Sequence, residues 1–352
     1  MRDASQPALS VLDVAPVGSG STPSQALDRI GPLAQLAEET GYTRFWLAEH
    51  HGMPSIASSS PEILIHHAAS CTERIRVGAG GIMLPNHAPL RIAEAFHTLE
   101  AFHPGRIDLG LGRAPGTDPA TSRALRPFDP DRFADQVAEL QALSRGDYPE
   151  GHPFHGVNVV PDDVELPPIW ILGSSGASAR LAGSLGLGYG FAGHFSTTSP
   201  VPALAAYRDA FRPSERFPDP HAILALSVVC APTEEEAEYL SRSMDLAWIQ
   251  LRRGRFGPLP TPEEAMAYDY SPQEEAIVAQ YRKLLVQGTP EGVAEQLRGR
   301  ADSTGAQEVM VSTMVHDPEA RLRSHELVAE AVLGSADDAE NPRAERIGPG
   351  VR

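Results

Sequence analysis

Glu49, His50 and His51 stand in a row after an apolar run and are the residues best suited to acid–base chemistry. Histidine has an ordinary pKa close to neutrality, so its ring can both take up and release a proton there. Because adjacent residues of a strand point to opposite faces, we expect at most one of the two histidines to face a common site. The same argument disfavours a zinc metallohydrolase, whose ligands must share one face, although that interpretation stays open. We therefore predict a reactive histidine and no metal.

A serine-rich segment could hold a phosphate group. Residues 173–178 (GSSGAS) leave a predicted strand and enter a predicted helix, where free backbone N–H groups and the helix dipole favour an anion. Serine hydroxyls would add further donors, although serine at this place is also a common helix cap. The candidate positions are Ser174, Ser175, Gly176 and Ser178.

Two arginines earlier in the chain could supply the charge that a phosphate needs. Arg113 lies in the glycine-containing loop GRAPG, and Arg123 follows a short loop further on. A guanidinium binds phosphate through two parallel hydrogen bonds, although either arginine by itself is more typical of a surface or ion-pair residue. If the fold brings the arginines and the serines together, a cofactor phosphate is the favoured ligand.

Gly80 and Gly81 interrupt the apolar run IRVGAGGIML at residues 75–84. Glycine weakens a strand interior, so such a pair is typical of a bulge or of a flat ligand that presses on the backbone. A planar cofactor ring would fit this position. A pair of small residues that lets a barrel taper is the competing interpretation.

The elements that must position these residues alternate between short apolar runs and longer amphipathic runs, which predicts a parallel sheet with crossover helices. The expected strands are Leu9–Val14, Arg44–Glu49, Ile75–Leu84, Arg106–Gly112, Ile169–Gly173, Gly188–Ala192, Ala222–Cys230 and Glu308–Met314. The expected helices are Ser24–Thr40, Pro61–Thr72, Pro89–Phe102, Asp129–Ser144, Ser178–Leu185, Val201–Phe211, Thr233–Leu251, Pro290–Ser303 and Pro318–Val332. This order predicts an α/β fold, a (β/α)8 TIM barrel, with a doubly wound open sheet as the alternative.

Two insertions account for the length beyond the roughly 250 residues that such a barrel needs. One spans 147–167, where the run HGVNVV at 155–160 predicts an added strand or hairpin. The other spans 252–285 and comprises a long loop at 252–270 and a helix at Pro272–Leu285. In a barrel the site lies at the C-terminal ends of the strands, which is where the candidate residues fall.

Composition excludes several classes of function. The 352 residues include 46 acidic and 29 basic side chains and carry a net charge of −17, the opposite of what binding to a nucleic-acid backbone requires. No apolar run approaches the roughly 20 residues of a membrane span, and segment 1–30 lacks the pattern of a secretion signal. Cys71 and Cys230 are too few for a disulfide scaffold. We expect a cytoplasmic protein that binds neither nucleic acid nor membrane, with one domain over 1–334 and a disordered tail over 335–352.

Taken together, four segments resemble the bacterial luciferase-like flavin-dependent monooxygenases. They are FWLAEHH at 45–51, VGAGGIMLPNHAPLRIAEAF at 77–96, HPGRIDLGLGRAPGTD at 103–118 and ILGSSGASARLAGSLGLGY at 171–189. Their order and spacing follow that family from about Leu9 to Leu333, nearly the whole barrel. The most similar subgroup includes oxygenases from natural-product pathways.

This resemblance implies a barrel that binds FMN, which a separate NAD(P)H:flavin reductase supplies in reduced form. It implies that O2 adds at the flavin 4a carbon and that the resulting hydroperoxide oxygenates a small organic substrate. His50 takes the place of the catalytic histidine, Glu49 that of a cofactor-binding residue, and Gly80–Gly81 that of a non-prolyl cis peptide against the flavin ring. The residues that match phosphate-binding positions are Arg113, Arg123, Ser174, Ser175, Gly176 and Ser178. The family also implies a homodimer that pairs through the second and third barrel helices.

Two other functions stay compatible with the same barrel. A deazaflavin-dependent oxidoreductase would transfer hydride without oxygen, and a non-catalytic FMN-binding protein would store or carry FMN, although the presence of His50 argues against mere carriage. The segments expected to face a substrate, 13–19, 53–60 and 194–198, contain no recognisable substrate motif. The substrate, and the choice among hydroxylation, epoxidation and Baeyer–Villiger insertion, therefore stay open.

Overall fold

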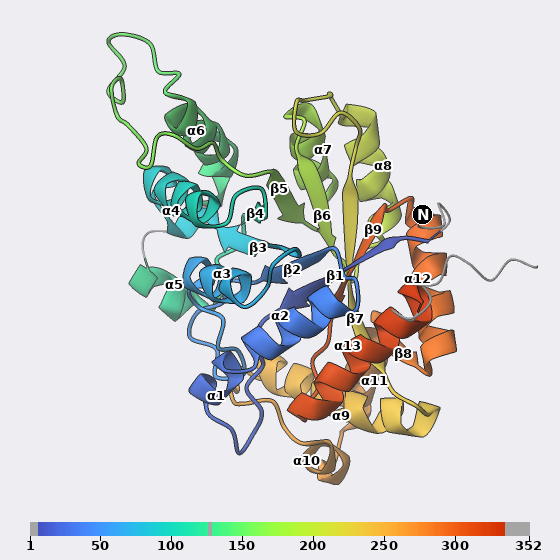
Figure 1. Cartoon of the computed structure of the whole chain (residues 1–352). Coiled ribbons are helices and arrows are strands. Elements are labelled where there is room, and N and C mark those ends of the chain that lie inside the picture. The colour runs from blue at the N-terminus through green and yellow to red at the C-terminus, as the bar shows by residue number, and fades with distance from the viewer. Residues whose placement is uncertain (1–5, 126–128, 335–352) are drawn as a thin grey trace, which may run out of the picture.

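Eight parallel strands close into a barrel in the computed structural model, which describes residues 6–125 and 129–334 (Figure 1). They are β1 (Ala8–Asp13), β2 (Arg44–Leu47), β3 (Arg76–Met83), β4 (Ile107–Gly112), β5 (Ile169–Gly173), β6 (Gly188–Ala192), β7 (Ala222–Cys230) and β9 (Glu308–Ser312). The strands pair in chain order, and β9 pairs with both β7 and β1 to close the ring. The predicted TIM barrel is confirmed, and the open-sheet alternative is wrong.

One further strand of the described chain, β8 (Leu285–Gly288), lies outside this ring. β7 is long enough to pair with β9 as far as Ser227 and with β8 from Ser227 to Cys230. The helix expected at Pro272–Leu285 therefore ends earlier, as α11 (Pro272–Arg282), because the chain then turns into β8.

Helices surround the barrel (Figure 1). The longer ones are α2 (Ile30–Glu39), α3 (Pro61–Ser70), α4 (Pro89–Phe102), α6 (Phe133–Arg145), α7 (Gly176–Ser184), α8 (Pro200–Ala210), α9 (Glu234–Arg252), α12 (Pro290–Thr304) and α13 (Pro318–Leu333). Proline opens several of them, since its fixed φ suits the first turn and its missing N–H costs nothing there. The helix expected at Ser24–Thr40 is instead α1 (Pro23–Leu27) followed by α2, because Pro32 has no N–H to bond the Asp28 carbonyl in one continuous helix.

The first insertion does not contain the strand or hairpin predicted at 155–160. This run consists of turns and irregular chain, and Gly156 adopts a left-handed φ of +78°, which breaks an extended conformation. Val159 packs directly into the core, so its apolar character serves burial there rather than strand pairing.

The second insertion is more ordered than the long loop predicted at 252–270. It contains α10 (Pro262–Ala267), which Thr261 and Glu264 start with a capping box. Another short helix, α5 (Pro119–Leu125), was also not predicted. The tail predicted to be disordered, 335–352, lies outside the described residues.

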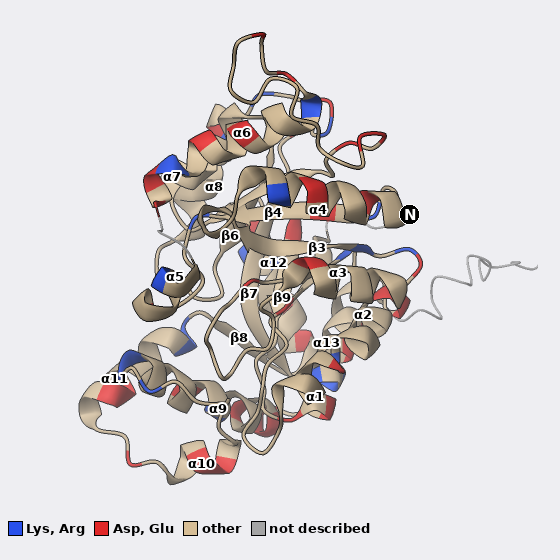
Figure 2. Cartoon of the chain, turned by 90° about the vertical axis from the view of Figure 1, so that its left-hand side faces the viewer, with Lys and Arg blue, Asp and Glu red and all other residues tan. Residues whose placement is uncertain are grey.

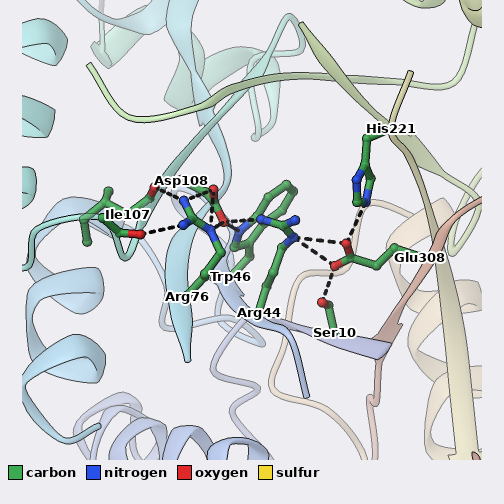
Figure 3. A network of polar contacts seen from close by, with 9 residues as sticks. Ser10, Arg44, Trp46, Arg76, Ile107, Asp108, His221 and Glu308 are labelled. Atoms are coloured by element: carbon green, nitrogen blue, oxygen red, sulfur yellow. Dashed lines mark hydrogen bonds and ion pairs between the residues drawn. The ribbon is translucent and has the colours of Figure 1, made fainter. Parts of the chain in front are cut away.

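The N-terminal end of the barrel interior holds a layer of charged side chains, the ion layer (Figure 3). Arg44 of β2 donates to Asp108 of β4 at 2.8 Å and to Glu308 of β9 at 3.0 Å, and neither carboxylate has exposed surface. Arg76 of β3 donates to Asp108 at 2.6 Å, and the His221 ring lies 3.0 Å from Glu308. Because this layer lies at the end opposite to the C-terminal strand ends, we interpret it as stabilising the fold.

The next layer of the interior is apolar. The rings of Trp46 and Trp170 meet edge to face with centroids 5.5 Å apart, and Leu12, Ile223 and Met310 belong to the same cluster. This packed core separates the ion layer from the C-terminal mouth of the barrel, where the candidate site residues lie.

Candidate active site

His50 stands at the mouth of the barrel, shortly beyond the end of β2. Arg44, Trp46 and Ala48 belong to the barrel interior, and strand alternation continues this inward series to His50. The Nδ1 atom of His50 donates to the Gly116 carbonyl at 3.2 Å, so Nε2 is the acceptor in the neutral ring. Burial lowers the pKa of His50, against the opposing effects of the Gly116 carbonyl and Glu49. His50 is therefore a neutral base at neutral pH.

Glu49 and His51, which flank His50 in the chain, bond to each other with Oε1 and Nε2 2.8 Å apart. The Glu49 carboxylate, which has no exposed surface, also accepts from the His87 ring at 2.9 Å and from the Met83 N–H at 2.8 Å. Burial would raise the pKa of Glu49, but the bonds from these groups lower it to about 2. Glu49 thus ties the end of β2 to the end of β3 and fixes the backbone that carries His50.

Acid is expected to weaken the fold as Glu49 takes up a proton. Its folded pKa of about 2 lies below the ordinary value of 4.5, so its contribution is complete above about pH 4.5 and is lost as the pH falls toward 2. The shift corresponds to about 3 kcal/mol. Urea unfolding of the wild type and of Glu49→Gln across this window measures it. The difference between the two should shrink as the pH falls, and a constant difference would contradict the prediction.

Gly80 and Gly81 form a stretch of β3 without side chains. The peptide bond between them is cis, as the resemblance implied. A Cβ atom on Gly81 would lie 2.6 Å from the Gly110 carbonyl oxygen, and one on Gly80 would lie 2.6 Å from the Leu12 side chain. The fixed backbone of Gly110 therefore excludes any side chain at Gly81, whereas a residue other than glycine at position 80 would have to displace the end of the Leu12 side chain. The bare backbone of the pair suits a planar ring.

Arg113 and Ser178 line one cavity of about 270 Å³ beyond the ends of β4 and β5. Its other lining residues are Pro130, Asp131, Phe133, Ala134, Ala177 and Leu181. The first turn of α7 forms one wall, and the Ser175 hydroxyl caps that helix by accepting from the Ser178 N–H at 3.4 Å. A guanidinium beside a helix N-terminus is an arrangement that binds an anion.

The remaining predicted phosphate residues do not line this cavity. Arg123 is exposed on α5 and is not among the residues that line the cavity. Ser174 offers its carbonyl to the Thr198 hydroxyl at 3.2 Å, and Gly176 lies next to the Arg180 guanidinium. Figure 2 shows acidic residues spread over the outer helices, including α4, α6 and α10. The structure thus brings Arg113 and Ser178 to one cavity and places Arg123 outside it.

Two of the segments expected to face a substrate pack against each other. Pro16 bridges to Ile56, and the Val17 N–H donates to the Ser55 carbonyl at 2.9 Å. Leu259, from the second insertion, donates to the Val17 carbonyl and accepts from the Ser19 N–H, each at 2.8 Å. These backbone bonds join segments 16–19 and 55–56 with Leu259 into one structure, which we call the mouth wall.

His87 and Asn86 help to build the site, although the sequence pattern did not single them out. They follow β3, where the Asn86 amide donates to the Pro115 carbonyl at 3.0 Å and the His87 ring donates to Glu49. Their position directly after the C-terminal end of a strand is the signal that could have identified them.

Within residues 6–125 and 129–334, no helix is both long and apolar enough to cross a membrane. In the same part of the chain, no group of three or more His, Cys, Asp or Glu side chains is arranged to hold a metal ion.

Residues 8–308 match the sequence profile of a family described as luciferase-like monooxygenase. A protein of Escherichia coli (strain K12) named luciferase-like monooxygenase is 44% identical over 333 residues, which cover 93% of this chain and 98% of that protein. The N-acetyl-S-alkylcysteine monooxygenase of Bacillus subtilis (strain 168) is 34% identical over 93% of this chain and 98% of its own. The crystal structure of apo-MsnO8 is 38% identical and superposes with a TM-score of 0.86 over 95% of this chain and 99% of that one.

More distant solved structures share the fold and differ in cofactor. The oxygenating constituent of 3,6-diketocamphane monooxygenase of Pseudomonas putida, in complex with FMN, is 20% identical with a TM-score of 0.69 over 93% of this chain and 98% of that one. An F420-dependent secondary alcohol dehydrogenase is 15% identical with a TM-score of 0.66 over 93% and 99%. Proteins of this fold thus bind FMN or F420.

Proposed function

This chain belongs to the luciferase-like monooxygenase family and is a monooxygenase, and we propose that it uses FMN, reduced by a separate flavin reductase, to insert one atom of O2 into a small organic substrate. The observation that carries this proposal is the placement of these groups on four neighbouring strands, β2 to β5: the Gly80–Gly81 backbone lies within β3, and His50, Arg113 and the first turn of α7 follow β2, β4 and β5. Arg113 and the first turn of α7 suit the phosphate of one cofactor, while His50 and the glycine backbone suit its ring.

The residues fit FMN part by part. Arg113 and Ser178 would hold the phosphate, and the bare backbone of Gly80–Gly81 would lie against the ring. When bound, reduced FMN supplies the electrons for the reaction with O2. His50 would hold or move a proton at Nε2, the nitrogen that its bond to Gly116 leaves free to accept. Glu49, whose oxygens are taken by protein donors, acts as a positioning residue for His50.

The test of this function mixes the protein anaerobically with photoreduced FMN and then with O2 in a stopped-flow spectrophotometer. We expect a transient flavin absorbance that outlasts the oxidation of free reduced FMN. Reoxidation as fast as that of free flavin, with FMN still bound, would overturn the proposed FMN-dependent reaction with O2 in favour of flavin carriage. Tighter binding of F420 than of FMN, in a parallel titration, would favour deazaflavin-dependent hydride transfer instead.

Replacing Arg113 with glutamine is expected to weaken FMN binding about 10- to 100-fold, because a hydrogen bond to a charged group contributes about 1.5–3 kcal/mol. Fluorescence titration measures the affinity. Riboflavin lacks the phosphate, so its affinity should not change. Arg123→Gln is the matched control, since Arg123 lies outside the cavity that Arg113 lines. An equal loss in both variants would contradict the assignment of the phosphate to Arg113.

A thioether is the first substrate class to try. The relative that acts on N-acetyl-S-alkylcysteine aligns with nearly the whole chain at 34% identity. We propose an N-acetylated S-alkylcysteine as the probe, with its sulfoxide as the product to detect by mass spectrometry. If reduced FMN is oxidised while the thioether is neither converted to a sulfoxide nor otherwise consumed, this probe is excluded as a substrate, and the cofactor chemistry is judged by the stopped-flow test.

We also propose that two copies of the chain pair through α3 and α4. Ile63 of α3 and Phe102 of α4 expose 67% and 66% of their surfaces, which is typical of an apolar contact surface. Phe102→Asp is therefore expected to convert a dimer into a monomer in sedimentation experiments. Phe154→Asp, on the first insertion, is the control that should stay dimeric. A monomeric wild type would contradict the proposal.

A further inference from the structure

The loop that follows β4 lies against the end of β2 and contacts the residues around His50. This loop comprises residues 113–118 (RAPGTD), and Arg113 at its start lines the cavity described above. The carbonyl oxygen of Gly116 accepts two hydrogen bonds, from the His51 N–H at 3.2 Å and from Nδ1 of His50 at 3.2 Å. One backbone oxygen thus fixes both the main chain at His51 and the direction of the His50 ring.

Gly116 can approach so closely because it has no side chain. Its φ is +66°, in the left-handed region that other residues rarely adopt. A Cβ atom there would lie 2.8 Å from the Glu49 carbonyl oxygen. Gly116 has no side chain with which to hold its own position, so that position depends on its neighbours. On one side, the Pro115 carbonyl accepts from Asn86 at 3.0 Å, and on the other side stands Thr117.

The Thr117 side chain holds the loop to the end of β2. Its hydroxyl donates to the His51 carbonyl at 2.5 Å, whereas the nearest Asp118 oxygen lies 3.5 Å away. The loop therefore bonds to both backbone groups of His51, to the N–H through Gly116 and to the carbonyl through Thr117. These two bonds lie next to the bond between Gly116 and the His50 ring, so they fix the oxygen that this ring contacts.

The Gly116 bond decides which nitrogen of His50 can act as a base. A neutral imidazole carries its proton on one of its two nitrogens, and the hydrogen bond that one nitrogen makes selects the form. With the Gly116 carbonyl in place, Nδ1 carries the proton and Nε2 accepts. If the carbonyl moved away, a fraction of the molecules would carry the proton on Nε2 and could not accept one there. The bond also raises the pKa of His50, against the larger opposing effect of burial.

We propose that Thr117 is a positioning residue for the reaction, because it holds the Gly116 carbonyl against Nδ1 of His50 and so keeps Nε2 free to accept a proton. This inference rests on the proposed function, in which His50 handles a proton. Thr117 acts through hydrogen bonds of the main chain and not by contact with the reacting atoms.

Loss of the Thr117 hydroxyl should leave Arg113 in place. Arg113 directly follows Gly112, which the sheet pairs with Met83 of β3 and with Leu172 of β5. The position of Arg113 is therefore set by the barrel and not by the far end of the loop. A substitution at Thr117 can thus separate the proton end of the site from its phosphate end.

Histidine-selective ¹⁵N NMR of the protein without flavin tests the role of Thr117 directly, with His50→Ala to identify the His50 signals. Thr117→Val keeps the shape of the side chain and removes the hydroxyl. The Nδ1 signal of His50 should then move toward the chemical shift of a nitrogen without a proton. Thr117→Ser retains the hydroxyl and should keep the wild-type signals.

Thr121→Val is the matched control for this spectrum. The Thr121 hydroxyl donates to Asp118 at 2.5 Å and not to the end of β2, so its loss should leave His50 unchanged. His50 signals that stay the same in Thr117→Val, or that change equally in Thr121→Val, would overturn the proposal. The spectrum does not depend on any reaction of the protein, so it separates failure of this inference from failure of the proposed function.

The pH dependence of turnover distinguishes positioning from a merely structural role. With saturating reduced FMN, Thr117→Val is expected to lower turnover about 2- to 10-fold, the factor that one neutral hydrogen bond contributes, with unchanged FMN affinity. Turnover that needs a neutral His50 falls as the pH drops below the pKa of His50. Loss of the Gly116 bond lowers that pKa, so the acidic limb of the profile should move to lower pH.

Thr117→Ser should restore both the rate and the acidic limb, because a hydroxyl is again available to the His51 carbonyl. A slower Thr117→Val protein whose acidic limb stays in place would indicate a structural role only and would overturn the proposal. A Thr117→Val protein with the wild-type rate and the wild-type limb would overturn it as well.

Discussion

Replacing Arg44 with methionine is expected to lower the free energy of unfolding by about 3–5 kcal/mol. Arg44 is the shared partner of Asp108 and Glu308, and both carboxylates lie inside the barrel without exposed surface. The substitution keeps an unbranched, flexible side chain there, so the loss reports chiefly on the two carboxylates left with fewer partners. Chemical unfolding followed by circular dichroism measures the difference.

Arg29→Met provides the matched control for this prediction. Arg29 also pairs with a carboxylate, Glu319, at 2.9 Å, but both side chains are exposed, so its removal should cost less than about 1 kcal/mol. Burial raises the pKa of Glu308, while Arg44 and His221 lower it, with a net result of about 2. In the Arg44 variant that pKa should rise. Equal losses in the two arginine variants would contradict the stabilising role of the ion layer.

His50→Ala is expected to reduce turnover of reduced FMN and O2 with substrate by about 10²–10⁴-fold. Alanine cannot hold a proton where His50 presents a neutral ring with Nε2 as its acceptor. The transient absorbance expected for the wild type should also decay faster in the variant. Stopped-flow spectroscopy measures both the oxidation of reduced FMN and the decay of the transient absorbance. Mass spectrometry follows the consumption of the substrate.

His152→Ala is the control for His50, because His152 lies exposed on the first insertion. That variant should keep the wild-type rate and the wild-type transient. FMN affinity, measured for both variants, separates loss of chemistry from loss of cofactor. A His50 variant with full turnover and an unchanged transient would remove His50 from the reaction.

Features that depend on local sequence were predictable. The residues of α4 follow from an apolar period that begins at Pro89 and ends at Phe102, and the structure has the same bounds. Alternation was expected to separate the rings of His50 and His51, and the two rings bond to different groups, that of His50 to the Gly116 carbonyl and that of His51 to Glu49. In each of these cases the deciding pattern lies within a short stretch of the chain.

Features that depend on distant partners were not predictable. His87 reaches Glu49 across 38 positions of the chain, and no spacing rule connects them. Arg44 and Glu308 stand at strand starts, where charged residues are usually solvated, and only the closed ring turns them inward. The strand β8 is four residues long and exists because β7 offers it a free edge, so its own residues carry little signal.

The mouth wall separates two requirements that often conflict in an evolving enzyme, namely a stable loop structure and side chains that are free to change. Its loops are held to each other by main-chain bonds, such as those from Val17 to Ser55 and from Leu259 to Val17, which do not depend on side-chain identity. Under the proposed function, in which these segments face the substrate, substitutions along the wall would alter which molecules are accepted without dislodging the loops. The architecture favours diversification of specificity by single amino-acid replacements, and it makes these positions the natural targets of a laboratory evolution library.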